Sequence, residues 1–245
     1  MKDFISSLFY KLGYTIIPNW TLDNFQLVDL VKKILQYHKV NCVIDIGANK
    51  GQYGDFMRKQ VDYHGRLISF EANEDVCINL KSFTSNDNLW DTYNIALGSR
   101  NETLPFNIMK KDTFSSFHSP TTEFTDKYST DNETAQSIPV KVQRLDEFIN
   151  QYLPSFENIY LKIDTQGHDL EVIKGCADVI SKITAIQLEI SSLRIYEDTP
   201  SMSQTLAFLQ KIGFDVCGLF PISVDRWNRI IEYDGVFINR LKCNI

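Results

Sequence analysis

The sequence predicts an α/β protein with a mostly parallel, doubly wound sheet. Short apolar runs typical of buried strands alternate with segments of helical periodicity, which indicates parallel strands joined by right-handed crossovers. The first apolar run ends in a turn with two glycines, at residues 45–51. The chain has 245 residues, a length that one large domain with a single core can reach.

The first half of the chain contains three predicted strands with helices between them. An apolar face recurs at helical spacing over residues 22–38, and Thr21 is suited to cap the start of this helix. The next elements are strands at 40–46, 66–70 and 92–97, a helix at 52–60, and a helix through Val76, Ile78 and Leu80.

The second half resumes the alternation and closes with a hairpin. The predicted elements are strands at 158–164 and 184–190, helices at 170–180 and 201–212, and closing strands at 214–219 and 235–239. The closing strands flank a short polar stretch, which suits an antiparallel connection. We therefore expect an antiparallel hairpin strand at the C-terminal edge of the sheet.

Residues 100–145 are predicted to be an inserted β segment. Strand-like stretches at 103–109 and 138–142 flank a polar loop at 115–137, which is rich in Ser, Thr, Asp and Glu. Loops of this length inside compact domains are usually functional or disordered. Both interpretations stay open: an ordered lid over a site, and an unstructured surface loop.

Residues 1–40 are predicted to be a helical lead-in to the main domain, 41–245. Apolar side chains such as Phe4, Leu8 and Leu12 fall at helical spacing, which suits a helix docked on the domain or on a second subunit. A homodimer through the N-terminal helices is one expectation from this pattern. No apolar run reaches the roughly 20 residues that a membrane span needs, so no transmembrane segment is expected.

Composition narrows the class of protein. Apolar residues make up 43% and charged residues 23% of the chain, as in ordinary globular proteins. The formal net charge is -6 and no run of Lys and Arg occurs, so no nucleic-acid partner is expected. The five Cys are odd in number, far apart and without a C-x-x-C pair, which favours reduced thiols in a cytoplasmic protein. Asp164 and His168 alone do not make a metal site, so no metal is expected.

The most informative segment is V-I-D-I-G-A-N-K-G-Q-Y, residues 43–53. A buried strand ends in an acid, and the chain then turns through two glycines into a helix. Glycines at such a turn let a ligand approach the backbone, and open α/β sheets bind ligands beyond the carboxyl ends of their strands. The residues predicted here to bind a cofactor are Asp45, Gly47, Ala48, Asn49 and Gly51.

The same turn favours S-adenosylmethionine (SAM) over a nicotinamide dinucleotide. A dinucleotide fingerprint reads G-x-G-x-x-G and brings a pyrophosphate to a helix N-terminus, whereas this turn reads G-x-x-x-G. Asp45 stands two residues before the first glycine. Its carboxylate would repel an anion and attract the cationic sulfonium and ammonium groups of SAM.

Two further strand ends complete the predicted cofactor site. Glu71 ends the second strand, 20 positions after Gly51, where a carboxylate can accept hydrogen bonds from ribose hydroxyls. We predict that Glu71 and the adjacent Ala72 bind the cofactor. Asn94 and Ala96 lie where the adenine would be, and we predict the same role for them. For Asn94 a structural role is an equal alternative.

Several segments resemble the FkbM family of SAM-dependent methyltransferases. They are V-I-D-I-G-A-N-K-G-Q (43–52), I-S-F-E-A-N (68–73), N-I-A-L-G-S (94–99), V-Q-R-L-D-E-F (142–148), L-K-I-D-T-Q-G-H-D-L-E-V-I-K-G (161–175) and I-Q-L-E-I-S (186–191). The resemblance implies a Rossmann-like class I methyltransferase fold and SAM as cofactor. It also implies O-methylation of a hydroxyl on a sugar, polyketide or peptide natural product.

The chain departs from the family pattern at two positions. Ala72 stands where the family usually has Pro, which changes the stiffness of a loop more than its chemistry. Gln166 stands where the family usually has Glu. An amide can form hydrogen bonds but cannot act as a base, so a catalytic role for this position is doubtful.

Asp164 and Glu189 are the candidate catalytic residues. Asp164 ends a strand that should lie beside the first strand, near the transferred methyl group, and a helix cap is the alternative role. Glu189 lies in an apolar strand run, where an acid is costly without a partner or a function. Its alternative is a salt bridge, for example with Lys162 or Arg194. His118 in the polar loop is a further candidate base, and a solvated loop histidine is the more ordinary interpretation.

Two other functions stay open at this level. The glycine spacing and Asp45 speak against a nicotinamide-dependent oxidoreductase on a similar fold. Gln166 gives slight support to a non-catalytic SAM-binding protein. For a methyltransferase, the expected partner is a small-molecule or glycan acceptor, whose identity the sequence does not declare.

Overall fold

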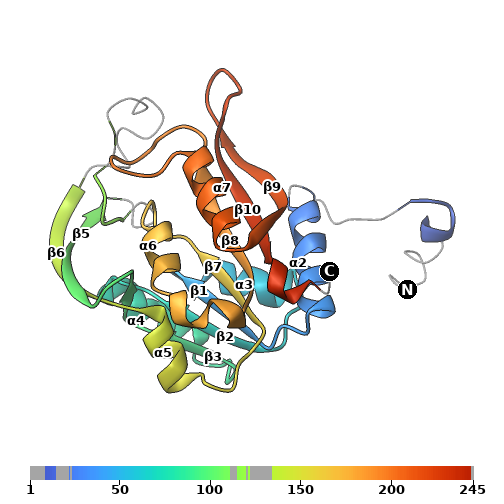
Figure 1. Ribbon diagram of the computed structural model, residues 1–245, viewed down its shortest axis with the longest axis horizontal. Helices are drawn as coiled ribbons and strands as arrows, with labels where there is room; N and C mark the ends of the chain where they lie inside the picture. The colour runs from blue at the N-terminus through green and yellow to red at the C-terminus, as the bar shows by residue number, and fades with distance from the viewer. Residues whose placement is uncertain are drawn as a thin grey trace.

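The computed structural model describes residues 9–14, 22, 24–110, 115–119, 121 and 134–243. These residues form a seven-stranded sheet, in the order β3-β2-β1-β7-β8-β10-β9, and a separate three-stranded sheet, in the order β4-β6-β5 (Figure 1). The strands of the large sheet are β1 (Cys42–Ile46), β2 (Arg66–Phe70), β3 (Trp90–Tyr93), β7 (Ile159–Ile163), β8 (Ile183–Ser191), β9 (Phe214–Val224) and β10 (Ile230–Asn239).

The pairing in the large sheet confirms the predicted fold class. Strands β3, β2, β1, β7 and β8 run parallel to one another. Strand β10 is antiparallel to both β8 and β9, so β9 and β10 form the expected hairpin. Because β10 runs against its neighbours, the tip of this hairpin lies at the same edge of the sheet as the carboxyl ends of the parallel strands.

Helices cover both faces of the large sheet. On one face, α2, α3 and α4 contribute buried side chains, and on the other face α5, α6 and α7 do so. The helices are α2 (Phe25–Tyr37), α3 (Gln52–Lys59), α4 (Glu74–Thr84), α5 (Leu145–Tyr152), α6 (Asp169–Lys174) and α7 (Met202–Lys211), with 3-10 turns η3 (Ala177–Lys182) and η4 (Arg240–Lys242). None of the helices among the described residues is long and apolar enough to cross a membrane.

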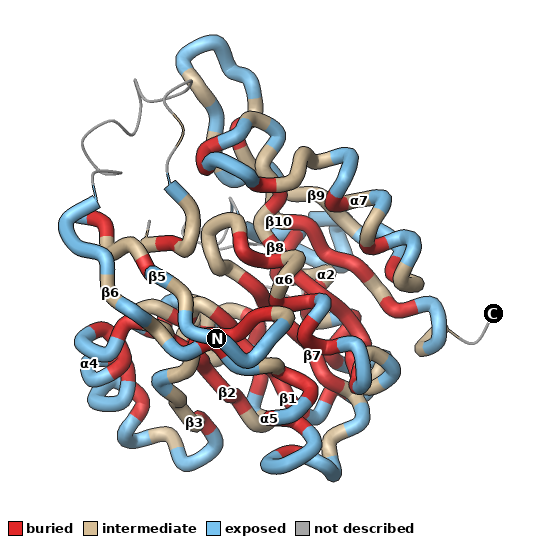
Figure 2. Tube along the Cα trace, turned by 60° about the vertical axis from the view of Figure 1, so that its left-hand side comes forward, coloured by how far each residue is buried: buried red, intermediate tan, exposed pale blue. Residues whose placement is uncertain are grey.

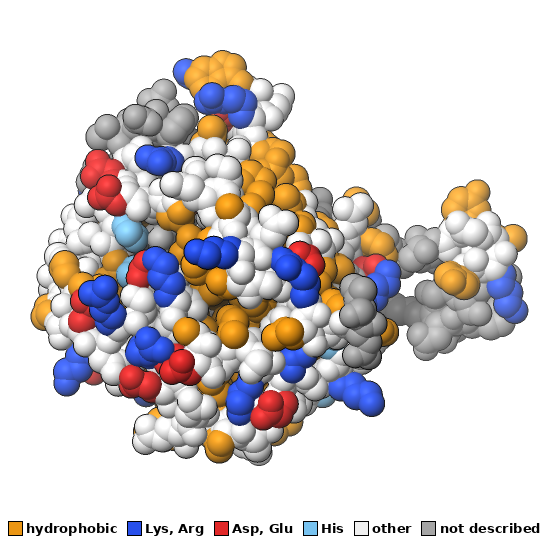
Figure 3. Space-filling view, viewed as in Figure 1, with side chains coloured by type: hydrophobic (Ala, Val, Ile, Leu, Met, Phe, Trp, Pro, Cys, Tyr) orange, Lys and Arg blue, Asp and Glu red, His pale blue; other side chains and the backbone are white. Residues whose placement is uncertain are grey.

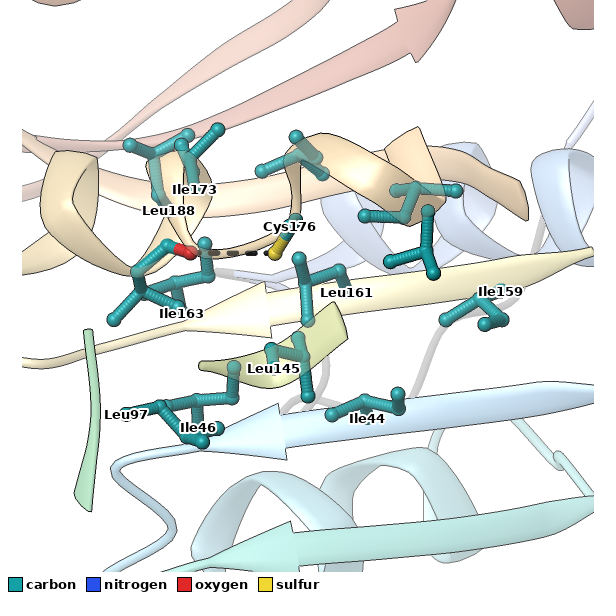
Figure 4. Close-up of a cluster of buried hydrophobic side chains, with 14 of the residues drawn as sticks. Ile44, Ile46, Leu97, Leu145, Ile159, Leu161, Ile163, Ile173, Cys176 and Leu188 are labelled. Carbon is teal, nitrogen blue, oxygen red and sulfur yellow. Dashed lines mark hydrogen bonds between the residues drawn. The ribbon is translucent and has the colours of Figure 1, made fainter. Parts of the chain in front are cut away.

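The alternation of side chains along the central strands explains this double cover. Ile44 and Ile46 of β1 pack in the cluster under α5 and α6, whereas Val43 packs in the cluster under α2 and α3. Figure 4 shows the first cluster, in which Leu161 and Ile163 of β7 lie beside the residues of β1. Both strands are buried along their whole length, as Figure 2 shows by colour.

The insertion forms its own small sheet. Its strands are β4 (Ala96–Leu97), β5 (Glu102–Met109) and β6 (Thr134–Gln143). The strand predicted at 92–97 is therefore wrong as one element, because it divides into β3 of the large sheet and β4 of the small sheet. The side-chain amide of Asn94 donates to the carbonyl oxygens of Glu71 and Ala72 at 2.9 and 3.1 Å, which ends the pairing with β2 at Tyr93.

The polar loop predicted at 115–137 is shorter than expected. Residues 134–137 belong to β6, and Ser116 pairs with Asn107 of β5 in an isolated bridge. Residues 120 and 122–133 lie outside the described part of the chain. Whether the whole segment is an ordered lid stays a prediction.

The lead-in helix begins later than predicted. Helix α2 starts at Phe25 after Asn24, whose side chain forms no capping bond, and the proposed cap Thr21 lies outside the described residues. Leu27 and Val31 of α2 are buried in the same cluster as Val43 of β1. The helix thus belongs to the core, while the boundary at residue 40 and the homodimer through the N-terminal helices stay predictions.

The carboxyl ends of β1 and β7 meet at Gly47. This residue has φ +79°, and a Cβ atom added to it would lie 1.9 Å from the carbonyl oxygen of Asp164. A side chain at this position would therefore force apart the two turns that follow the central strands.

We predict that Gly47→Ala lowers the free energy of unfolding by roughly 3 kcal/mol or more, from the clash and the strained φ together. The matched control is Gly213→Ala. Gly213 also has a positive φ, +97°, but an added Cβ would meet nothing within 4 Å. Its expected cost is about 1–2 kcal/mol. Urea unfolding of both variants measures the difference, and equal losses would contradict the close approach of the two turns.

Candidate functional site

A cavity of about 360 Å³ lies at the carboxyl ends of the parallel strands. Its floor comes from the turns after β1, β2 and β7 and from β8, and Phe106 and Phe117 of the insertion form part of its wall. Its volume is in the range of cavities that bind small molecules. The sheet order predicts a site here, because connections leave β1 and β7 toward opposite faces of the sheet.

Nine of the eleven residues predicted for the site line this cavity. They are Asp45, Gly47, Ala48, Asn49, Glu71, Ala72, Ala96, Asp164 and Glu189. Gly51 and Asn94 do not line it. Gly51 instead precedes α3 and packs against the side chains of Leu80 and Phe83. Asn94 holds the turn after β2 by the two bonds described above, which fits the structural alternative, and its contact with adenine stays a prediction.

The glycine turn after β1 is fixed by bonds to β2 and its turn. The backbone N–H groups of Gly47 and Ala48 both donate to the carbonyl oxygen of Phe70 at 3.0 Å. The N–H of Asn49 donates to Oε2 of Glu71 at 2.8 Å. These bonds join the first two turns of the sheet into one unit.

Glu71 is held from both sides. Its Oε1 accepts a bond from the N–H of Asn73 at 2.8 Å, while its Oε2 accepts from Asn49. The side chain is buried, and burial raises its pKa while the N–H donors act to lower it. The carboxylate is therefore oriented before any ligand binds, and each oxygen retains a lone pair for another donor.

A row of buried polar side chains crosses the sheet just below the cavity. Ser69, Asp45, Lys162 and Gln187 occupy the same register on β2, β1, β7 and β8. All four are at most 4% exposed. Tyr53 of α3 donates to Oε1 of Gln187 at 2.7 Å from above this row.

Asp45 has a strongly perturbed environment in this row. Burial raises its pKa to about 7, with Lys162 acting to lower it, Asp164 to raise it, and the Ser69 hydroxyl, 3.3 Å away, to lower it. Ser69 in turn accepts a bond from Nε1 of Trp90 at 3.0 Å. The aspartate at the end of the first strand was predicted, but the lysine beside it was considered only as an ion-pair partner for Glu189.

Lys162 pairs with a different carboxylate from the one predicted. Its Nζ lies 3.6 Å from Oδ1 of Asp234 on β10, and Asp234 also accepts a bond from Nε2 of Gln187 at 2.9 Å. Neither Lys162 nor Asp234 was predicted as a site residue. A lysine inside the apolar run I-Y-L-K-I was the signal in the sequence that a charged partner lay opposite.

The two candidate catalytic carboxylates are brought together by Gln166. Its Nε2 donates to Oδ1 of Asp164 at 2.7 Å and to Oε2 of Glu189 at 3.3 Å, and its Oε1 accepts from the Tyr196 hydroxyl at 2.7 Å. Burial raises the pKa of Glu189 well above its usual value, and Asp164 adds to this effect. The position where the chain departs from the family pattern therefore lies between both carboxylates.

The described part of the polar loop is docked onto this side of the cavity. Ser116 is fully buried and its Oγ donates to the backbone oxygen of Gln166 at 2.6 Å. The Glu197 N–H donates to the backbone oxygen of Ser119 at 2.8 Å. His118 is half-buried beside His168, with ring centroids 5.8 Å apart, and burial lowers its pKa. The interpretation of His118 as a solvated loop residue is therefore wrong, and it does not line the cavity.

Electrostatics define the kind of ligand that fits. Among the charged residues described around the cavity, five are carboxylates and one, Lys162, is a base. Burial keeps these charges from being screened by water. A cationic ligand relieves the repulsion between them, whereas a pyrophosphate would increase it. Among the described residues, no group of three His, Cys, Asp or Glu side chains is arranged to hold a metal ion.

The chain matches a known family and known structures. The model of the methyltransferase FkbM domain matches residues 45–216. A methyltransferase FkbM from Methylobacillus flagellatus is 15% identical, with a TM-score of 0.49, over 81% of this chain and 43% of that chain. This chain thus spans less than half of that protein.

Two further structures are similar at lower identity. The methyltransferase domain of bacterial CtHen1 is 10% identical, with a TM-score of 0.46, over 88% of this chain and 98% of that chain. A SAM-dependent methyltransferase from Aquifex aeolicus is 12% identical, with a TM-score of 0.39, over 84% and 88%. These similarities carry nothing about the substrate of this chain. Among curated proteins, none matches this chain.

The raised pKa of Asp45 predicts that this residue destabilises the protein without ligand. Its folded pKa, about 7, lies above the usual value of 3.8, so the unfolded chain ionises first and stability falls as the pH rises between these values. We expect Asp45→Asn to remove this penalty and to raise the free energy of unfolding at pH 8 by about 1–3 kcal/mol.

Urea unfolding between pH 4 and 8 tests this prediction. The gain in Asp45→Asn should grow up to about pH 7, the folded pKa of Asp45, and then stay constant. The control is Asp29→Asn, at an exposed carboxylate, which should give no comparable gain. A loss of stability in Asp45→Asn at pH 8 would show that the ionised carboxylate is stabilising instead.

Proposed function

Because the chain belongs to the FkbM family of SAM-dependent methyltransferases, we propose that it methylates a hydroxyl oxygen of a sugar, glycan or natural-product acceptor. One observation carries the proposal: Asp164 and Glu189, two carboxylates on the cavity wall, share the amide of Gln166. Such a pair can orient a hydroxyl and accept its proton. The family assignment decides against the nicotinamide-dependent alternative.

We assign the cofactor-binding roles to the first two turns of the sheet. Gly47, Ala48 and Asn49 form the surface against which the methionine part would lie, and Glu71 would accept bonds from the ribose hydroxyls. Asp45 would face the cationic groups. When bound, SAM supplies an electrophilic methyl group, which is transferred to the acceptor oxygen with departure of neutral S-adenosylhomocysteine.

The acceptor would enter on the side of Asp164 and Glu189. Loss of the hydroxyl proton makes the oxygen a better nucleophile, and a carboxylate within hydrogen-bond reach can take that proton. Gln166 would keep both carboxylates in place without adding a third negative charge. The acidity of this wall favours a neutral polyhydroxyl acceptor over one with a phosphate or carboxylate beside the methylated oxygen.

The partners and the cytoplasmic compartment expected from the sequence remain predictions. Basic and acidic side chains are interspersed on the face shown in Figure 3, and no single basic patch dominates it. On this face, the pattern gives no support to a nucleic-acid acceptor. The cytoplasmic compartment and the homodimer stay predictions.

We predict that Glu71→Gln weakens binding of SAM about 10- to 100-fold, because the amide N–H₂ must face one of the two backbone N–H donors of Asn49 and Asn73. S-adenosylhomocysteine carries the same ribose, so it should lose affinity equally. Isothermal titration calorimetry measures both. The control is Glu74→Gln, an exposed neighbour at the start of α4. Unchanged affinity in Glu71→Gln would overturn the ribose role.

Methyl-labelled SAM with a panel of glycosides, lipid-linked glycans and glycosylated polyketides tests the reaction. We expect label on an acceptor oxygen, located by mass spectrometry. With that acceptor, Asp164→Asn and Glu189→Gln should lower kcat by roughly 10²–10⁴-fold, with SAM affinity changed only a few-fold. Label on nitrogen or carbon would refute O-methylation. Tight SAM binding with no product from any acceptor class would favour the non-catalytic alternative.

A further inference from the structure

Lys162 occupies an unusual position for a lysine. It is 4% exposed, in the middle of the polar row, and it is the base among the described residues that line the cavity. Carboxylates surround it from every neighbouring element. They are Asp45 on β1, Asp164 and Asp169 in the turn after β7 and at the start of α6, Glu189 on β8, and Glu232 and Asp234 on β10. On the remaining side its Nζ lies 5.8 Å from the centre of the Tyr53 ring.

The lysine is charged although it is buried. Burial acts to lower its pKa, but the carboxylates raise it above the usual value, Asp234 most strongly. Its Nζ contacts Asp234 at 3.6 Å and the backbone oxygen of Ile163 at 3.5 Å. These contacts engage only one of the carboxylates directly. The other carboxylates are influenced by the charge of the ammonium without a direct contact, and Asp45 is its register partner on the adjacent strand.

We propose that Lys162 is a positioning residue for cofactor binding, whose ammonium increases the ionised fraction of Asp45, its register partner on β1, so that the cavity offers more negative charge to the cationic cofactor near neutral pH. A lysine in a site for a cation would otherwise weaken binding by repulsion. Lys162 strengthens binding only at pH values at which the carboxylates would be protonated without it. The role is thus specific to the pH range in which Asp45 titrates.

Lys162 both repels the cofactor and favours the ionised form of Asp45. Its removal should therefore change the affinity for SAM by different amounts at different pH, which removal of a purely structural residue would not do. Wild-type affinity for SAM is expected to fall as the pH drops below about 7, where Asp45 takes up a proton. An opposite charge nearby lowers the pKa of a carboxyl by about 1–3. Removal of the ammonium should therefore move the fall in affinity upward by about one pH unit or more. At pH values above the raised pKa of Asp45 in the variant, where Asp45 is ionised in both proteins, loss of the repulsion should leave the affinity unchanged or tighter.

Titration of SAM by calorimetry from pH 6 to 9, on wild type and Lys162→Met, tests the proposal. The amino group of SAM titrates in both experiments and cancels in the comparison. We expect weaker binding by Lys162→Met near pH 7 and a deficit that shrinks as the pH rises toward 9. The matched control is Lys59→Met, at an exposed lysine of α3 paired with Asp55, which should keep the wild-type profile. Equal weakening of Lys162→Met at every pH would overturn the proposal.

Two further measurements keep the test independent of activity and of folding defects. In the protein without ligand, the ¹³C carboxyl signal of Asp45 should titrate at higher pH in Lys162→Met, and no movement would also overturn the proposal. If Lys162→Met does not fold, Asp234→Asn replaces it. This variant frees the ammonium from its nearest carboxylate and should shift the fall in affinity to lower pH, and a shift upward would contradict the role. A wild-type protein that binds no SAM would instead refute the cofactor assignment.

Discussion

Burial of like charge at one edge of the sheet is the constraint on which the rest of this structure depends. The carboxyl ends of β1, β7, β8 and the opposed β10 bring acids together inside the protein, where water does not screen them. Burial raises the pKa of Asp45, Glu71 and Glu189 alike. Part of the free energy spent on burying these groups is recovered when a cation enters. The site is therefore built at a cost to the stability of the empty protein, and the family's cofactor carries the matching charge.

The sheet can hold this arrangement because its backbone turns are locked to one another. Gly47 lies against the carbonyl of Asp164, and the turn after β1 is bonded to Phe70 and Glu71. Glu71 thus has two functions. It joins the turns after β1 and β2 by accepting bonds from their backbone N–H groups, and it leaves oxygen lone pairs toward the cavity. Since Asp164 belongs to the same locked unit, the sides that we propose for the cofactor and for the acceptor are fixed relative to each other. In-line transfer requires this relation, because reacting atoms must be held in one geometry.

The parts of the site that the sequence predicts are those encoded locally. Asp45, Gly47 and Glu71 belong to short strand-turn motifs whose spacing is visible along the chain. Lys162 and Asp234 were missed, since their meeting depends on strand order and register between distant segments. The strand predicted at 92–97 was wrong as one element because the amide of Asn94 binds the neighbouring turn and interrupts the pairing, a contact that the local sequence does not reveal.

Gln166 shows how a departure from a family pattern can be consistent with the chemistry around it. Its left-handed backbone, φ 51°, turns the amide toward Asp164 and Glu189, and Tyr196 satisfies the amide oxygen. A glutamate there would have to carry a proton to make the same bonds, because three carboxylates cannot all ionise at hydrogen-bond distance in a buried site. The amide needs no such proton. It therefore donates to both neighbouring carboxylates without adding a third acid, which is compatible with the role that we propose for them.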